Sequence, residues 1–137
     1  MKKFALIIFF ILAIFITPAL AQFVVIVNKD NPISDISKKN LKNIYRLKKG
    51  TWTAGGSIHA LNLKPDNAVR VTFSQEILKK DPRSMVRFYL KRALSGKGQA
   101  PKEFASEAEL IKFVASDKGA IGYVSKADGS VKSIPVK

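Results

Sequence analysis

Apolar positions along the chain change their spacing several times, which predicts alternating strands and helices. Phe23 to Asn28 is a continuous apolar, β-branched run, typical of a strand buried on both faces. Apolar residues then recur at helical spacing from Leu41 onward, and Ser37 is the predicted N-cap of that helix. The basic pair before Gly50 predicts that the helix ends there.

The next segment predicts a hairpin followed by a helix. Gly55-Gly56 is a turn signal, and Ser57 to Leu63 is the expected returning strand. The following helix, residues 67–80, begins at Asp66 or Asn67, and its apolar side chains fall four apart. This stripe consists of Val69, Phe73 and Ile77.

Two further helices are expected in the second half of the chain. Asp81-Pro82 is an N-cap followed by proline at the first helical position, and this helix runs toward the glycine-rich loop SGKGQAP. Ser106 opens a capping box, S-x-x-E, for the last helix. Gly119 stands where a helix commonly ends on a residue with left-handed backbone.

Two strands are expected to close the sequence. They are Ala120 to Val124 and, after a hairpin turn at Asp128-Gly129, Val131 to Val136. The complete order, β-α-β-β-α-α-α-β-β, has neither repeats nor low-complexity linkers. It predicts one domain of the α/β class.

Residues 1–21 have the composition of a secretory signal peptide. Lys2 and Lys3 provide a cationic start, Phe4 to Ile16 is an apolar run, and Ala19-Leu20-Ala21 is a small-residue cleavage pattern. The run is shorter than the ~20 residues that span a bilayer, which favours cleavage over a retained anchor. We therefore expect a soluble protein, periplasmic or otherwise exported, with a single domain formed by residues 22–137.

The charge balance favours anionic partners. Losing Lys2 and Lys3 with the signal lowers the formal net charge from +14 to +12. Export argues against nucleic acid, which leaves small oxyanions, anionic lipid or glycan surfaces, or an acidic protein. The alternative is that the charge serves only solubility.

Few residues offer catalytic or metal-binding chemistry. The chain has no cysteine and one histidine, which excludes a thiol nucleophile and the usual Cys/His zinc clusters. His59 alternates along a predicted strand and is expected to be a packed or surface side chain rather than a catalytic base. Serine-hydrolase and P-loop motifs are absent. The sequence predicts a protein that is not an enzyme and has no cofactor or metal.

Basic side chains gather at two places. Lys64 and Arg70 bracket the start of the helix at Asp66-Asn67. Arg83, Arg87 and Lys91 lie four apart along the next helix, which predicts a cationic stripe. The stripe is either an ordinary solvated face or a docking surface, and no aromatic residue interrupts it to stack on nucleic-acid bases.

Four segments together resemble the phosphate-transporter substrate-binding proteins. The segments are VVIVNKDNPISDISKKNLKNIY, LNLKPDNAVRVTF, GKGQAPKEFASEAELIKFVASD and KGAIGYV. The resemblance covers nearly all of residues 22–137 and implies a single lobe of a type II periplasmic-binding-protein fold, a mixed sheet flanked by helices. It also implies phosphate or another oxyanion as ligand, with a second lobe, a homodimer, a membrane permease or a sensor as partner.

The resemblance places the ligand at the turn before the second helix, where the match is imperfect. The family has an arginine and a Ser-Gly-Thr here, whereas this chain has Leu63 near the arginine position and Asn67-Ala68-Val69 in place of Ser-Gly-Thr. Asp66 also adds negative charge. The turn is therefore either a weak oxyanion site or only a well-capped helix start. The candidate ligand-binding residues are Lys64, Asp66, Asn67, Ala68, Val69 and Arg70.

A basic surface module is the alternative function. Arg83, Arg87 and Lys91 would then dock on an acidic protein, a glycan or a membrane surface in the cell envelope.

Overall fold

The computed structural model describes residues 22–137. The predicted signal peptide lies outside these residues. Within them, no helix combines the length and apolar character needed to cross a bilayer.

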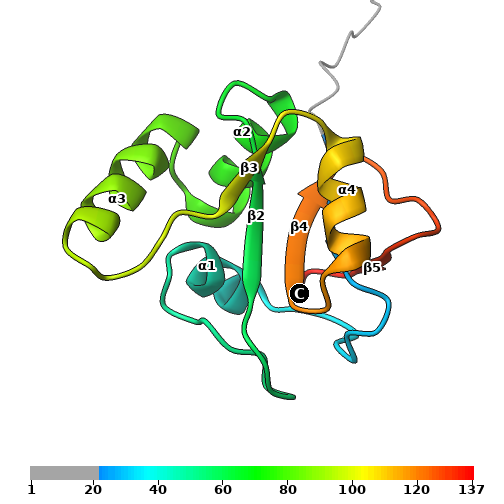
Figure 1. Ribbon diagram of the computed structural model, residues 1–137. Coiled ribbons are helices and arrows are strands. Elements are labelled where there is room, and N and C mark those ends of the chain that lie inside the picture. The colour runs from blue at the N-terminus through cyan, green and yellow to red at the C-terminus, as the bar shows by residue number, and fades with distance from the viewer. Residues whose placement is uncertain (1–21) are drawn as a thin grey trace, which may run out of the picture.

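The described chain folds around one five-stranded mixed sheet (Figure 1). In space the strands follow the order β3-β2-β4-β1-β5. The pairs β3-β2 and β2-β4 are parallel, whereas β1 is antiparallel to both β4 and β5. The strands are β1 (Val24–Val27), β2 (His59–Leu63), β3 (Lys102–Phe104), β4 (Ala120–Val124) and β5 (Lys132–Ile134).

Every predicted helix start forms through the N-cap that the sequence indicates. The side chains of Ser37, Asn67, Asp81 and Ser106 each accept a hydrogen bond from a backbone N–H in the first helical turn. The helices are α1 (Lys38–Tyr45), α2 (Ala68–Phe73) with its π-helical continuation η1 (Ser74–Leu78), α3 (Pro82–Leu94) and α4 (Glu107–Ser116).

The core lies on both faces of the sheet, because successive residues of a strand point in opposite directions. Gly122 in β4 leaves room for Leu110 of α4 on one face. The next residue, Tyr123, stacks on Phe73 of α2 on the other face, with ring centroids 3.9 Å apart. Tyr45 of α1 packs edge-on against Phe73 at 4.8 Å. The strand Val24–Val27 is almost fully buried, as predicted.

Two sequence predictions in the first half of the chain are wrong, and one strand was missed. The first helix ends at Tyr45 rather than near Gly50, because Leu47 adopts a left-handed backbone, φ 61°, that an α-helix cannot continue. The turn at Gly55-Gly56 forms, but the expected hairpin shrinks to one bridge between Thr51 and Ser57. The short strand β3 was not predicted.

The end of the sheet also differs from the prediction. The turn at Asp128-Gly129 does not connect a hairpin, since β1 lies between β4 and β5. Gly119 is not left-handed: the positive-φ glycines of the described chain are Gly55, Gly56, Gly96 and Gly98. It is needed for space instead, because a Cβ atom on Gly119 would lie 2.4 Å from the carbonyl oxygen of Ser57.

Candidate functional site

The candidate site lies where β2 ends and α2 begins. The Asn67 N–H donates to the Lys64 carbonyl at 3.0 Å, which closes the turn. The Asn67 side-chain oxygen accepts from the N–H groups of Val69 at 2.8 Å and Arg70 at 3.4 Å. Asn67, and not Asp66, is therefore the N-cap, and it occupies donors that an anion would otherwise use.

Arg70 points away from solvent, into the protein. Its side chain is 2% exposed, and Nη1 donates to the Leu63 carbonyl at 2.9 Å and to Glu103 of β3. Nζ of Lys64 lies 3.9 Å from the other carboxylate oxygen of Glu103. One carboxylate of the chain itself thus stands between the two cations that were predicted to bind an anion.

Parallel pairing of β2 and β3 brings Glu103 to this place. The register sets Asn62 opposite Glu103, one residue before β2 ends. Side chains at the carboxyl end of parallel strands meet at one edge of the sheet, the usual position of ligands in α/β folds. Sequence reasoning missed Glu103 because it had not predicted the strand that carries it.

Buried tyrosines support the site from beneath. The Tyr123 hydroxyl donates to the Asn62 side chain at 2.7 Å and accepts from the Leu63 N–H at 3.3 Å. The Tyr89 hydroxyl donates to the Tyr45 carbonyl at 2.7 Å. Burial raises the pKa of Tyr89 and that of Tyr123, so both stay neutral donors at physiological pH. The Tyr123 bonds tie the end of β2 to β4, and the Tyr89 bond ties α3 to the end of α1.

A groove opens beside these groups. It is lined by the polar residues Asn62, Lys64, Tyr89 and Glu103 and by the apolar residues Val86, Leu90, Ala93, Ala100 and Pro101. Arg70 does not line the groove and reaches it through its contact with Glu103. A few convergent polar groups against an apolar wall are typical of small-molecule sites.

The remaining predicted ligand-binding residues do not face this groove. Asp66 lines a separate hollow together with Arg83 and Arg87. Ala68 is exposed, and Val69 is half-buried against the core. The structure therefore brings Lys64 and Arg70 together and separates Asp66 from them.

The predicted cationic stripe is present on α3. Arg83, Arg87 and Lys91 are all exposed, and none of them takes part in an ion pair within residues 22–137. Arg87 donates to the Ser84 hydroxyl at 3.1 Å. Arg87 and Lys91 also line a shallow hollow with Arg46 and Lys80.

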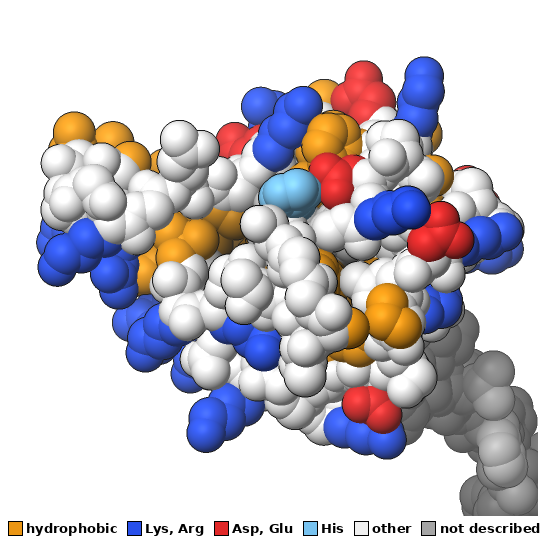
Figure 2. Space-filling view, turned by 60° about the horizontal axis from the view of Figure 1, so that its bottom comes forward, with side chains coloured by type: hydrophobic (Ala, Val, Ile, Leu, Met, Phe, Trp, Pro, Cys, Tyr) orange, Lys and Arg blue, Asp and Glu red, His pale blue; other side chains and the backbone are white. Residues whose placement is uncertain are grey.

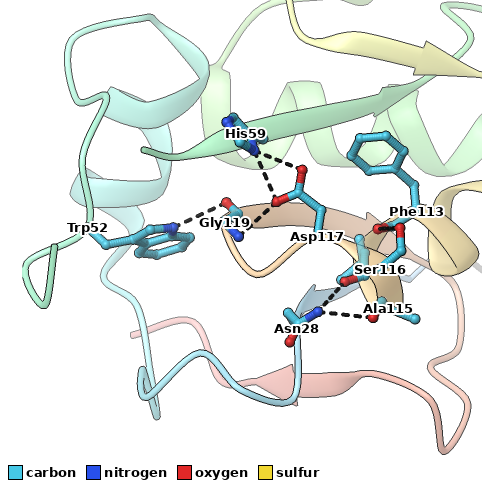
Figure 3. A network of polar contacts seen from close by, with 9 residues as sticks. Asn28, Trp52, His59, Phe113, Ala115, Ser116, Asp117 and Gly119 are labelled. Carbon is cyan, nitrogen blue, oxygen red and sulfur yellow. Dashed lines mark hydrogen bonds and ion pairs between the residues drawn. The ribbon is translucent and has the colours of Figure 1, made fainter. Parts of the chain in front are cut away.

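A second polar network surrounds His59 (Figure 3). Nδ1 of this half-exposed histidine lies 3.0 and 2.9 Å from the two carboxylate oxygens of Asp117. Asp117 also accepts from the Gly119 N–H at 2.9 Å, and the Trp52 indole donates to the Gly119 carbonyl at 3.1 Å. The nearby Ser116 hydroxyl donates to Phe113, not to the histidine. The network ties β2 to the turn before β4, as expected for a structural histidine.

Metal chemistry has no support in the described part of the chain. No group of three or more His, Cys, Asp or Glu side chains within residues 22–137 is arranged to hold an ion.

A family model described as a PBP superfamily domain matches residues 13–133, most of the chain. The chain belongs to the PBP superfamily. No curated protein matches it significantly. The family match agrees with the mixed sheet and flanking helices seen in the structure.

Several solved structures have the same fold as the described chain. Their similarity at 15–21% sequence identity concerns the fold. One is an ABC-type phosphate transport receptor from Vibrio cholerae, with a TM-score of 0.62, 18% identity, and 83% of this chain and 45% of that chain covered. A Clostridium perfringens protein described as a phosphate ABC transporter substrate-binding protein, with bound phosphate, has a TM-score of 0.66, 21% identity and coverages of 83% and 44%.

A third structure is PstS from Borrelia burgdorferi, with a TM-score of 0.63, 15% identity, and 83% of this chain and 46% of that chain covered. This PBP superfamily domain thus spans less than half the length of each of the three solved proteins. The resemblance stated from the sequence is confirmed at the level of family and fold.

Proposed function

We propose that the chain is an exported, non-enzymatic binding module that takes phosphate or another small oxyanion weakly, in phosphate uptake or sensing. Its site is the polar side of the groove beside β2, formed by Asn62, Lys64 and Glu103, with Arg70 behind Glu103. The observation that carries this proposal is the buried guanidinium of Arg70 at the carboxyl end of β2, next to a second cation.

Burial explains why an arginine here suits an anion. A guanidinium that is 2% exposed is stable only beside negative charge, because desolvation without a partner costs several kcal/mol. Glu103 supplies that charge in the described structure and is one-third exposed at the groove. An oxyanion entering the groove competes with the carboxylate for the same donors, or joins it by accepting from Lys64.

This competition sets the expected affinity. A charge-assisted hydrogen bond contributes about 1.5 to 3 kcal/mol. Repulsion from Glu103 opposes it, and Asn67 already occupies the N–H groups at the start of α2. Net binding of about −4 kcal/mol, a millimolar dissociation constant, is the expected result for the isolated chain. A second lobe, a second copy of the chain, or a permease or sensor subunit would complete the enclosure.

Calorimetric titration with inorganic phosphate and with sulfate tests the proposal. We expect weak binding by the wild-type protein and binding about tenfold tighter, or more, by Glu103→Gln, because the variant removes one negative charge next to the ligand. Glu76→Gln is the matched control: this acid is exposed and lies on η1, away from the groove, so its neutralisation should change the affinity by about twofold at most.

Two results would contradict the proposed oxyanion site. If Glu103→Gln folds, as judged by its melting transition, and still binds neither phosphate nor sulfate, the groove is not an oxyanion site. Equal gains in Glu103→Gln and Glu76→Gln would show that only the net charge of the protein matters.

A further inference from the structure

Helix α3 carries the large apolar side chains that the fold leaves uncovered. Among residues 22–137, the large hydrophobic residues that are exposed are Val86 at 41%, Leu90 at 58% and Leu94 at 81%. They follow one another at a spacing of four, so they form one row along the helix. Exposure rises toward the C-terminal end, where the row protrudes furthest.

A cationic row runs beside the apolar one. Arg83, Arg87 and Lys91 each stand three residues before a member of the apolar row, and residues three apart are neighbours on a helix surface. Residues 82–102 contain six Lys and Arg and no Asp or Glu. No ion pair of the described chain neutralises any of these six cations.

Helix α3 lies at one side of the molecule. The helix stands at the left of the molecule, beyond β2 and away from β4 (Figure 1), while its inner side is held by Met85 and Tyr89. Figure 2 shows hydrophobic side chains next to Lys and Arg over this part of the surface. A projecting row of apolar side chains beside cations has the form of an amphipathic helix at a lipid interface.

We propose that the outer face of α3 docks on an anionic lipid surface. Leu94 would enter the boundary between headgroups and acyl chains, with Leu90 beside it. Arg87 and Lys91 would lie along this boundary, with their alkyl stems against lipid and their charges at the phosphates. Val86 and Leu90 also line the oxyanion groove, so the lipid contact would border that groove, whereas Leu94 lies outside it.

Shape and charge favour lipid over an acidic protein. Leu90 and Leu94 are the most exposed members of the apolar row, and a bilayer surface can receive them without a groove shaped to fit. The acids beside the six cations of residues 82–102 are Asp66 and Asp81, next to Arg83 and Arg87, and Glu103 in the groove. The cations outnumber these acids, and this net positive charge suits an anionic surface.

Vesicle co-sedimentation with residues 22–137 tests the proposal. This segment contains the hydrophobic core of the described residues, from Val25 to Ile134. We expect binding to vesicles of phosphatidylcholine mixed with phosphatidylglycerol, and little binding to phosphatidylcholine alone. Leu94→Ser, which does not touch the groove, should weaken binding about fivefold or more, because it removes the most protruding apolar side chain.

Charge is tested with a matched pair of double variants. Arg87→Gln with Lys91→Gln should weaken binding about tenfold or more, since each cation near an anionic surface contributes on the order of a fivefold factor. The control is Lys38→Gln with Lys39→Gln, which changes the net charge by the same amount. These two lysines lie at the start of α1, whereas Tyr89 of α3 contacts the Tyr45 carbonyl at its end. It should weaken binding by about twofold at most.

A dye reports which face touches the lipid. Because the chain has no cysteine, Ser95→Cys and Lys38→Cys each allow one polarity-sensitive label. When anionic vesicles are added, only the emission of the label at residue 95 should shift toward the blue. The proposal is wrong if the wild-type protein does not bind these vesicles, if both double variants lose vesicle affinity equally, or if Leu94→Ser binds like wild type. Capture of an acidic protein without vesicle binding would also overturn it.

Discussion

Two cationic regions of the molecule differ in how their charge is compensated. At the end of β2, Arg70 is buried and bonded to Glu103, with Lys64 beside the same carboxylate. On α3, Arg83 and Arg87 are exposed and no ion pair of the described chain involves them. The sequence alone makes the two groups look alike, as basic residues flanking or lining a helix.

Burial explains the difference between the two regions. A buried charge must be neutralised within the fold, because removing it from water costs several kcal/mol. An exposed charge is solvated and needs no partner. The Arg70–Glu103 pair at the end of β2 therefore contributes to the stability of the protein, whereas the cations of α3 are solvated.

The largest effect that sharpens this contrast is expected for Arg70. Arg70→Met leaves the Glu103 carboxylate and the Leu63 carbonyl without their donor, and should lower the free energy of unfolding by about 2 to 4 kcal/mol. Arg87→Met should change it by about 0.5 kcal/mol at most. Urea denaturation of both variants measures the difference. Similar losses in the two variants would show that burial does not separate the two regions.

A smaller effect is expected at Gly119, which lies just before β4 and close to the backbone of Ser57. Gly119→Ala and Gly119→Asn should each lower the free energy of unfolding by about 1 to 3 kcal/mol, because the added Cβ meets backbone of Ser57. Asparagine tolerates left-handed backbone, so a requirement for positive φ would spare Gly119→Asn. Thermal melting distinguishes the two reasons: an asparagine variant as stable as wild type would contradict the close approach.

The smallest effect is expected at the start of α3, as a dependence of stability on pH. The Asp81 carboxylate accepts from the Ser84 N–H, and this bond lowers the pKa of Asp81 in the folded state. Its contribution is therefore present above the unfolded-state pKa of about 3.9 and is lost as pH falls through the lower folded-state value. Asp81→Asn keeps a capping oxygen that does not titrate.

Melting curves of wild type and Asp81→Asn should therefore converge or cross only in strongly acidic solution. A stability difference that stays constant down to about pH 2 would mean that the carboxylate contributes nothing through its charge.

Local interactions made much of the fold predictable. The four helix starts were predicted correctly because an N-cap such as Ser37 or Ser106 bonds a backbone group within three residues. The buried strands β1 and β4 were predicted because a continuous apolar run needs cover on both faces. The family resemblance rested on the same local patterns and was confirmed by the family model.

Contacts between distant residues decided the rest. Whether Arg70 binds a ligand or a carboxylate depends on Glu103, which lies 33 residues away and arrives through the pairing of β2 with a three-residue strand. Such a strand has too few positions to show a period. The insertion of β1 between β4 and β5 likewise follows from sheet order, which no turn residue specifies.

The sequence by itself therefore determined the helix starts with their caps, the buried strands β1 and β4, the charge and the family. The tertiary structure decided which charges are neutralised inside the fold and which remain on its surface. The physical reason is range: a cap or an apolar period acts over one turn, whereas desolvation depends on everything that packs around a side chain. Arg70 and Arg87 carry the same charge, and only packing makes one a buried partner of Glu103 and the other an exposed group on α3.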